Sequence, residues 1–369
     1  MSVRKNSRKW IFTVFAAVFF FILGAAFHRY KPWPYGLIKR TAQKGLAPRP
    51  YDPDGEILRF AFTGKLENRI PQKYPACFTI DEVSRRINAY WTDVRWFWSA
   101  FEDLVIDSVK NGPVTEVYYH LHERAYSANA LFVPGEGDVS RQTGMASLII
   151  PGSGENQATP IFFQDEDNYQ SNIAGVSSKY SDTYILVKPN HDFLAIHNGK
   201  NRINLEFING YLLNRGGSYS ALYLIHSLAL VKHLKDVYPE VMVLGISQGA
   251  NAALLNALQS EPAGAVIASK YTVLFDKLLW AQFNQIIIPG ADLFDRQQIR
   301  RMMAGQGTKY LITYGRRDVA FNRVEAEEGY TAAFFKCLPN VQVRNHEGAH
   351  EYPLEMITVF YQSLLPGER

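Results

Sequence analysis

Short, continuously apolar segments alternate with longer segments of helical spacing from residue 146 onward. This alternation is the feature that most restricts the possible folds. Strands that are apolar on both faces and separated by helices specify a mostly parallel sheet covered by helices on both sides. The sequence therefore predicts an α/β fold, with strands at 146–154, 182–191, 240–247, 264–270, 309–315 and 341–348 and helices at 219–239 and 248–262.

Two further elements are predicted upstream of this pattern. Residues 80–108 have helical apolar spacing and follow the capping-box spacing of Thr79 and Glu82, so we predict a long helix there, rich in aromatic side chains. Residues 114–135 alternate apolar and polar side chains around a turn, which predicts two antiparallel strands.

The N-terminus carries an uncharged apolar run at residues 10–27, which four basic residues precede. At about 1.5 Å per residue this run makes roughly 27 Å of helix, enough to cross a thin hydrocarbon core. Trp10 on one side and Tyr30 on the other are typical of the aromatic belt of a spanning helix. We predict a retained transmembrane signal-anchor. The alternative is a cleaved signal peptide, because Gly24 and Ala26 are small residues at a suitable spacing.

Composition excludes several classes of protein. The 39 Lys+Arg and 35 Asp+Glu give a formal charge of only +4 with no large basic run in the body of the chain, so nucleic acid is not expected as a partner. The two cysteines, Cys77 and Cys337, lie too far apart in sequence to define a disulfide framework, and their pairing stays open. The histidines show no metal-binding spacing, so we expect neither a metal nor another cofactor.

The chemically most specific motif is Gly245-Ile246-Ser247-Gln248-Gly249, a G-x-S-x-G placed between a predicted strand and a predicted helix. A sharp strand-to-helix turn holds such a serine in a strained conformation that presents its Oγ, and the small flanking glycines let strand and helix approach. The helix N-terminus adds free N–H groups and partial positive charge. We interpret Ser247 as a nucleophile.

From about Val114 to the C-terminus the chain resembles the α/β-hydrolase superfamily, in which the serine is followed by an acid and then a histidine. The resemblance implies that Asp318, just after the strand at 309–315, is the acid and that His350, just after the last strand, is the base. Asp292 is the alternative acid, although a helix cap is the interpretation we prefer for it. His346 is the alternative base, and its position within a strand favours a structural role.

The resemblance also implies an oxyanion hole with two backbone N–H donors, one from the residue after the nucleophile and one from a loop after an early strand. The first is Gln248. The second is Ser153 or Gly152, because Pro151-Gly152-Ser153-Gly154 stands where related esterases carry a His-Gly-Gly pattern.

We therefore expect a membrane-anchored serine hydrolase that cleaves a carboxylic ester, or a related acyl bond, of a small or lipid-like substrate. An acyltransferase, a thioesterase and a non-catalytic binding protein remain alternatives. The expected organisation is a tail and anchor at 1–30, a Pro-rich linker and aromatic helix at 31–112, and a catalytic domain at 113–369 with a cap at 192–218. The expected location is the bacterial inner membrane with the catalytic domain outside the cytoplasm, or secretion if the signal is cleaved.

Overall fold

The computed structural model of the chain describes nine segments, all within the compact unit Pro53–Arg369. They are residues 100–121, 124–136, 143–153, 157–164, 168–170, 172–188, 219–269, 296–318 and 330–365. The predicted membrane segment, most of the predicted aromatic helix, the predicted cap and Asp292 lie outside them.

Within these segments, no helix has the length and apolar character needed to cross a bilayer.

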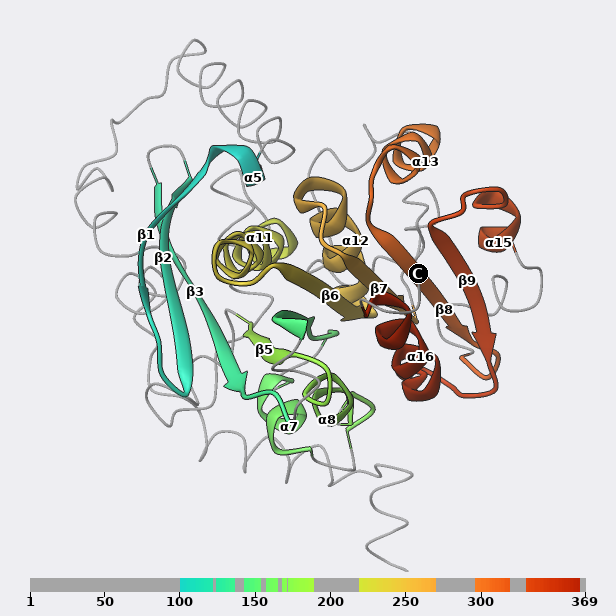
Figure 1. Cartoon of the computed structure of the whole chain (residues 1–369), viewed down its shortest axis with the longest axis horizontal. Coiled ribbons are helices and arrows are strands. Elements are labelled where there is room, and N and C mark those ends of the chain that lie inside the picture. The colour runs from blue at the N-terminus through green and yellow to red at the C-terminus, as the bar shows by residue number, and fades with distance from the viewer. Residues whose placement is uncertain are drawn as a thin grey trace, which may run out of the picture. The chain divides into compact units, whose positions relative to one another are not determined.

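The described strands form a single sheet in the order β1-β2-β3-β5-β4-β6-β7-β8-β9. In this spatial order, β1, β2, β3 and β5 pair antiparallel with one another. The neighbouring pairs that follow, from β5-β4 to β8-β9, are all parallel (Figure 1). Their bounds are β1 Leu104–Lys110, β2 Val114–Leu121, β3 Arg124–Val133, β4 Met145–Ile150, β5 Asp182–Val187, β6 Glu240–Ile246, β7 Gly264–Ala268, β8 Lys309–Gly315 and β9 Val341–His346.

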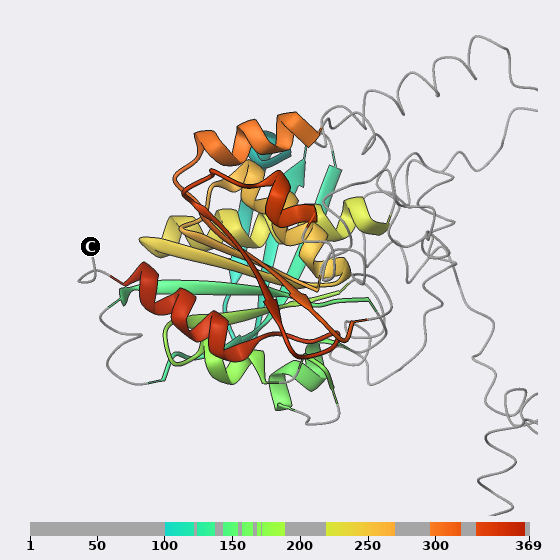
Figure 2. The same ribbon diagram turned by 90° about the vertical axis from the view of Figure 1, so that its right-hand side faces the viewer.

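Helices cover both faces of this sheet, as the apolar strands require. Figure 2 shows α11, α12 and α13 on one face and α7, α8 and α16 on the other. The described helices are α5 Ala100–Asp103, α7 Ala158–Phe163, α8 Ile173–Ser177, α11 Tyr219–Val237, α12 Gln248–Ser260, α13 Arg296–Gly305, α15 Tyr330–Phe334 and α16 Leu354–Leu364. Strands β4 and β7 are buried along their whole length, which follows from this double cover. The predicted α/β architecture is confirmed.

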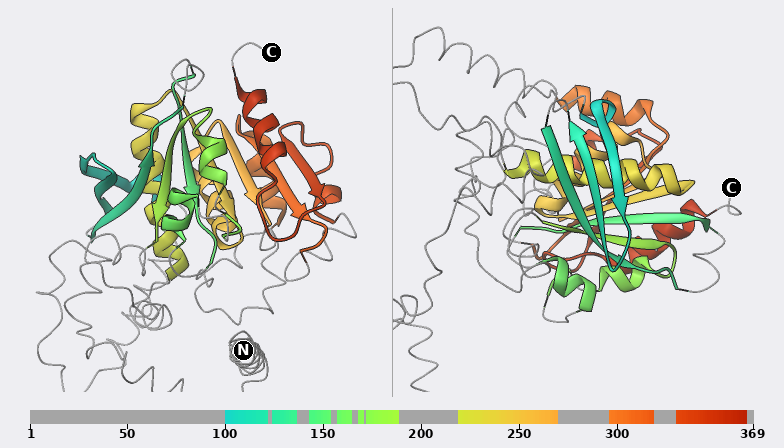
Figure 3. Two further views of the ribbon diagram at one scale, coloured as in Figure 1. Left: turned by 90° about the horizontal axis from the view of Figure 1, so that it is seen from below. Right: turned by 90° about the vertical axis from the view of Figure 1, so that its left-hand side faces the viewer.

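The predicted helix at 80–108 is wrong at its C-terminal end. The described part of that helix stops at Asp103, and Leu104–Lys110 is the edge strand β1, paired antiparallel with β2 (Figure 3). Strand β2 offers this segment a partner for backbone pairing, and the β-branched Val105, Ile106 and Val109 favour an extended strand. This tertiary pairing overrides the helical spacing of apolar residues in the sequence. The sheet thus begins before residue 113.

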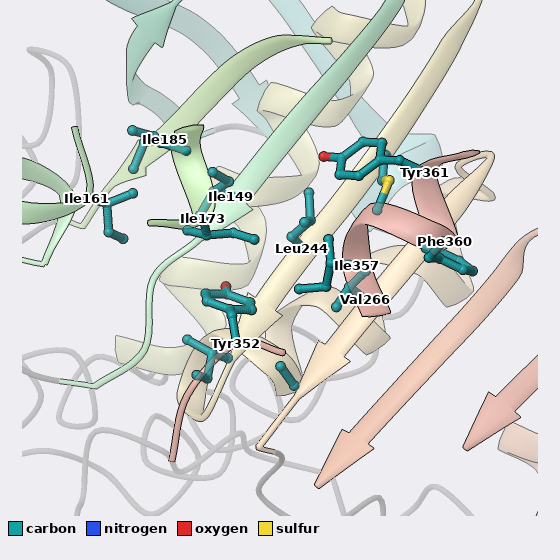
Figure 4. Close-up of a cluster of buried hydrophobic side chains, with 14 of the residues drawn as sticks. Ile149, Ile161, Ile173, Ile185, Leu244, Val266, Tyr352, Ile357, Phe360 and Tyr361 are labelled. Carbon is teal, nitrogen blue, oxygen red and sulfur yellow. The ribbon is translucent and has the colours of Figure 1, made fainter. Parts of the chain in front are cut away.

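An apolar cluster joins the sheet to the helices on its α16 side (Figure 4). Ile357 and Phe360 of α16 pack in the same buried cluster as Leu244 of β6 and Val266 of β7. The Tyr361 hydroxyl is buried there as well, 2.8 Å from Ser147 Oγ and 2.7 Å from Ser177 Oγ. Since its polar atom is hydrogen-bonded, this tyrosine adds packing area without an unsatisfied group.

His226 is buried on the opposite face, where α11 packs on the antiparallel strands. Its ring meets Tyr119 of β2 edge to face, with the centroids 6.1 Å apart. Burial lowers the pKa of His226 from 6.5 to about 3, and a backbone hydrogen bond with Ser127 opposes this effect only in part. The folded protein therefore holds a neutral imidazole at this position.

This histidine makes stability depend on pH. A pKa that is lower in the folded state gives stability that is complete above pH 6.5 and is lost as the pH falls from there toward 3. We predict that the unfolding free energy of the wild type, relative to His226→Gln, falls by about 1.4 kcal/mol per pH unit over this window. Urea unfolding at pH 7, 6, 5 and 4 measures this difference. A difference that stays constant with pH contradicts the prediction.

Candidate active site

Ser247 lies at the turn between β6 and α12, with φ 57° and ψ −121°. This left-handed backbone is strained for a residue with a side chain. The flanking glycines make it possible, because a Cβ on Gly245 would collide with the Gly249 carbonyl and a Cβ on Gly249 would collide with the Ile150 carbonyl. The predicted strand–turn–helix context of the motif is confirmed.

A buried acid and a histidine meet at the neighbouring strand ends. His350 Nδ1 lies 2.7 Å from Asp318 Oδ2, with the histidine side chain 25% and the aspartate side chain 1% exposed. The loops that carry them are tied together by the hydrogen bond from Arg317 N to the Gly348 carbonyl, 3.0 Å. Gly315 makes this approach possible, because any side chain there would strike the Ala349 carbonyl.

Tyr169 connects the two halves of the site. Its ring lies 5.3 Å from the His350 ring, centroid to centroid. An ideal Cβ built on Gly152 would lie 2.5 Å from the Tyr169 hydroxyl and 3.3 Å from Ser247 Cβ. The Gly152 loop, Ser247, Tyr169 and the His350–Asp318 pair therefore share one end of the sheet.

The serine and the histidine are not hydrogen-bonded in this structure. Ser247 Oγ is buried and has no hydrogen-bond partner among the described residues. Hydrogen bonds between nucleophile and base are commonly long or misaligned before substrate binds. The structure thus brings the predicted acid and base into contact and places the predicted nucleophile at the same edge.

His346, the alternative base, has a local role. Its Nδ1 accepts a hydrogen bond from Gly348 N, 3.2 Å, which shapes the turn leading to His350. Burial lowers its pKa, although Glu351, Asp318 and Glu347 act in the opposite direction. This contact with the turn agrees with the structural role expected for His346.

The predicted oxyanion donors differ in what their N–H groups do. Gly152 N donates to Gln170 Oε1 at 2.7 Å, in a buried position. Gln170 is itself held by Gln157, whose Oε1 accepts from Gln170 Nε2 at 2.6 Å. With the Gly152 N–H engaged in this way, Ser153 is the better donor of the two residues that the sequence left open.

Lys188 and Tyr223 are parts of the site that sequence reasoning missed. Lys188 Nζ donates to the Gly152 carbonyl at 2.8 Å and to Gln248 Oε1 at 2.9 Å. The Tyr223 hydroxyl donates to the Pro151 carbonyl. Lys188 lies within the apolar segment predicted as a strand at 182–191, and a lysine in such a buried segment was the available signal, since charged residues are rarely buried without a purpose.

The described part of the chain contains no group of three or more His, Cys, Asp or Glu side chains that could hold a metal ion. Cys337 is exposed and forms no disulfide with a described residue. Cys77 lies outside the described residues, so the pairing of the two cysteines stays open.

The mostly parallel sheet, covered on both faces and carrying a serine at a strand-to-helix turn, is the arrangement expected of the α/β-hydrolase fold. No family model matches the sequence, and no curated protein matches it either.

Solved structures similar to this chain include a family 15 carbohydrate esterase, a glucuronoyl esterase from Caldicellulosiruptor kristjansonii, with 13% identity and a TM-score of 0.49 over 84% of this chain and 90% of that one. Est1E from Butyrivibrio proteoclasticus has 16% identity and a TM-score of 0.41, over 67% and 96%. The carboxylesterase CesB from Bacillus subtilis has 12% identity and a TM-score of 0.38, over 77% and 100%. Similarity at this level extends no further than general architecture, so any assignment of a reaction rests on this chain's own residues.

Proposed function

We propose that this protein is a serine hydrolase that cleaves a carboxylic ester, or a related acyl bond, through an acyl-enzyme intermediate. The observation that carries the proposal is the 2.7 Å contact between His350 Nδ1 and the buried carboxylate of Asp318, at the same sheet edge as the strained Ser247. These are the three residue types that nucleophilic acyl transfer requires.

In the proposed reaction Ser247 Oγ attacks the carbonyl carbon, and His350 Nε2 takes the hydroxyl proton. Asp318 accepts a hydrogen bond from His350 Nδ1–H, which fixes the tautomer with a basic Nε2 and stabilises the imidazolium that forms. His350 then protonates the leaving alcohol. In the second half the same nitrogen takes a proton from water, which attacks the acyl-enzyme and releases the acid.

Negative charge on the tetrahedral oxygen needs fixed donors. The first donor is the N–H of Gln248. Because Gln248 is the first residue of α12, the positive end of the helix dipole also stabilises the negative oxygen there. The second donor in this proposal is Ser153 N–H, in the loop after β4 and adjacent in sequence to Gly152, which lies against Ser247. Both are backbone groups, so the oxyanion hole needs neither a metal nor a side chain.

Residues 10–27 lead us to propose further that the chain is anchored in a membrane with its catalytic domain outside the cytoplasm. The uncharged run and its aromatic flanks support this placement. An anchor of this kind brings the hydrolase close to ester substrates at a membrane surface.

A fluorophosphonate probe tests the nucleophile. We expect rapid labelling of the wild type and none of Ser247→Ala, together with loss of p-nitrophenyl butyrate hydrolysis by at least about 10³-fold, because no other group forms the acyl-enzyme. Ser108→Ala, at an exposed position on β1, is the matched control and should behave as wild type. Equal labelling of wild type and Ser247→Ala refutes the assignment.

Asp318→Asn tests the acid. We expect kcat to fall by about 10³-fold or more with little change in KM, since an amide favours the wrong histidine tautomer. Steady-state kinetics of Asp318→Asn, of Asp292→Asn and of the exposed control Asp236→Asn give the comparison. A large loss in Asp292→Asn with near-normal turnover in Asp318→Asn would assign the acid to the other aspartate.

Membrane fractionation tests the anchor. The full chain should stay in the membrane pellet through alkaline carbonate extraction, and Val18→Arg with Phe19→Arg should release it, because each arginine costs about 2.5–3.5 kcal/mol at the centre of a spanning helix. Val18→Leu with Phe19→Leu is the apolar control. A soluble wild-type chain whose mass shows cleavage after Ala26 contradicts the anchor and supports a signal peptide.

A further inference from the structure

Lys188 is completely buried at the end of β5, although lysine is among the residues least often found inside proteins. Its Nζ has two carbonyl-type acceptors, the backbone oxygen of Gly152 and the side-chain oxygen of Gln248. The same nitrogen lies over the rings of Tyr219 and Tyr223, 5.9 and 5.2 Å from their centroids. Both acceptors belong to residues around the proposed oxyanion hole.

The bond to Gly152 fixes the direction of a particular N–H group. The Gly152 carbonyl and the Ser153 N–H belong to the same peptide unit, and the described chain has no cis peptide bond. In a trans peptide the C=O and N–H point in opposite directions. With the oxygen held by Lys188, the Ser153 N–H points away from the ammonium group.

A second hydrogen bond fixes the preceding peptide. Gly152 N donates to Gln170 Oε1, so the peptide units on both sides of Gly152 have defined orientations. Glycine resists rotation less than any other residue, and no side chain fits here because of Tyr169 and Ser247. These two contacts, together with the hydrogen bond from the Tyr223 hydroxyl to the Pro151 carbonyl, therefore set the orientation of the loop.

The ammonium group also acts electrostatically. A cation on a peptide oxygen polarises the unit and strengthens its N–H as a donor, as in cooperative hydrogen-bond chains. A strengthened N–H donor favours the negatively charged oxygen of the transition state over the neutral carbonyl oxygen of the substrate, which is how differential stabilisation arises.

We propose that Lys188 is the positioning residue of the oxyanion hole. Its ammonium group orients the Gly152–Ser153 peptide so that Ser153 N–H donates to the tetrahedral oxygen, and it holds Gln248, whose N–H is the other donor. This inference rests on the proposed serine hydrolase function. It assigns Lys188 an effect on the transition state rather than on substrate binding.

Lys188→Met tests the inference, because methionine keeps much of the volume and removes the charge and the donors. In the full-length protein we expect kcat for p-nitrophenyl butyrate to fall about 10- to 10²-fold, somewhat less than for loss of a direct donor, with KM within about 3-fold. The rate of fluorophosphonate labelling should fall by a similar factor, while its end point still counts a full complement of sites.

Lys232→Met is the matched control. Lys232 Nζ also donates to a backbone carbonyl, that of Phe101 at 2.9 Å, and also lies over an aromatic ring, 5.3 Å from its centroid. It is on α11, in contact with α5 rather than with the Gly152 loop. We expect this variant to have wild-type kcat, so a loss common to both lysines would indicate a general effect of removing amines that bind backbone carbonyls and would overturn the inference.

A second variant covers the case in which Lys188→Met folds poorly. Lys188→Ala removes three carbons and the amine, so n-propylammonium matches the cavity that it leaves, and n-propanol fills similar space without a charge. We expect the ammonium ion to restore at least about 10-fold in kcat and the alcohol to restore little. If the ammonium ion and the alcohol restore kcat equally, or if neither restores it, the proposal is overturned, because the charge at this position then has no effect on kcat.

Failure of this inference is distinguishable from failure of the function. A wild type that is neither labelled nor active defeats the serine hydrolase assignment, and the role of Lys188 falls with it. A wild type that is labelled and active, with Lys188→Met equally fast, defeats only the role of Lys188. A KM that rises with unchanged kcat likewise overturns it, since that pattern marks ground-state binding.

Discussion

The close approach of the start of α12 to the end of β4 is the constraint on which the site depends. Gly249 lies against the Ile150 and Pro151 carbonyls so tightly that a single Cβ would displace the backbone. This approach brings Ser247 beside the Gly152 loop and leaves the serine at a positive φ. The strain is maintained because β4 and β6 are hydrogen-bonded neighbours in the buried centre of the sheet.

The same arrangement recurs at the other half of the site. Gly315, at the end of β8, admits the Ala349 carbonyl, and the parallel pairing of β8 with β9 brings Asp318 and His350 to adjacent loops. In both halves a glycine lets one backbone segment pack on another, and rigid strands fix the residues that follow. The proposed catalytic groups therefore derive their precision from the sheet and not from flexible loops alone.

The fold followed from the sequence because buried parallel strands leave a strong apolar signal. Strands β6 and β8 lie within the predicted segments, β4 begins one residue before its predicted segment, and the predicted hairpin is present as β2 and β3. The edge strand β1 was mistaken for helix because its side chains alternate only weakly and its pairing is a tertiary contact. Asp318 and His350 were predicted from the order of serine, acid and histidine along the chain, and the structure places these two side chains in contact.

The choice between Gly152 and Ser153 was beyond the sequence, because it depends on Gln170, a residue of a later loop that takes up one N–H. Lys188 was missed for a related reason. A lysine in a sequence suggests the surface, and only the fold places this one between the Gly152 carbonyl and Gln248.

The most direct test of this account is an experimental structure of the full chain after reaction with a fluorophosphonate, in which the phosphonyl oxygen stands in for the oxyanion. The account predicts phosphorus bonded to Ser247 Oγ and the phosphonyl oxygen about 2.7–3.1 Å from both Gln248 N and Ser153 N. An adduct on another residue, or an oxygen that contacts neither N–H group, would contradict it.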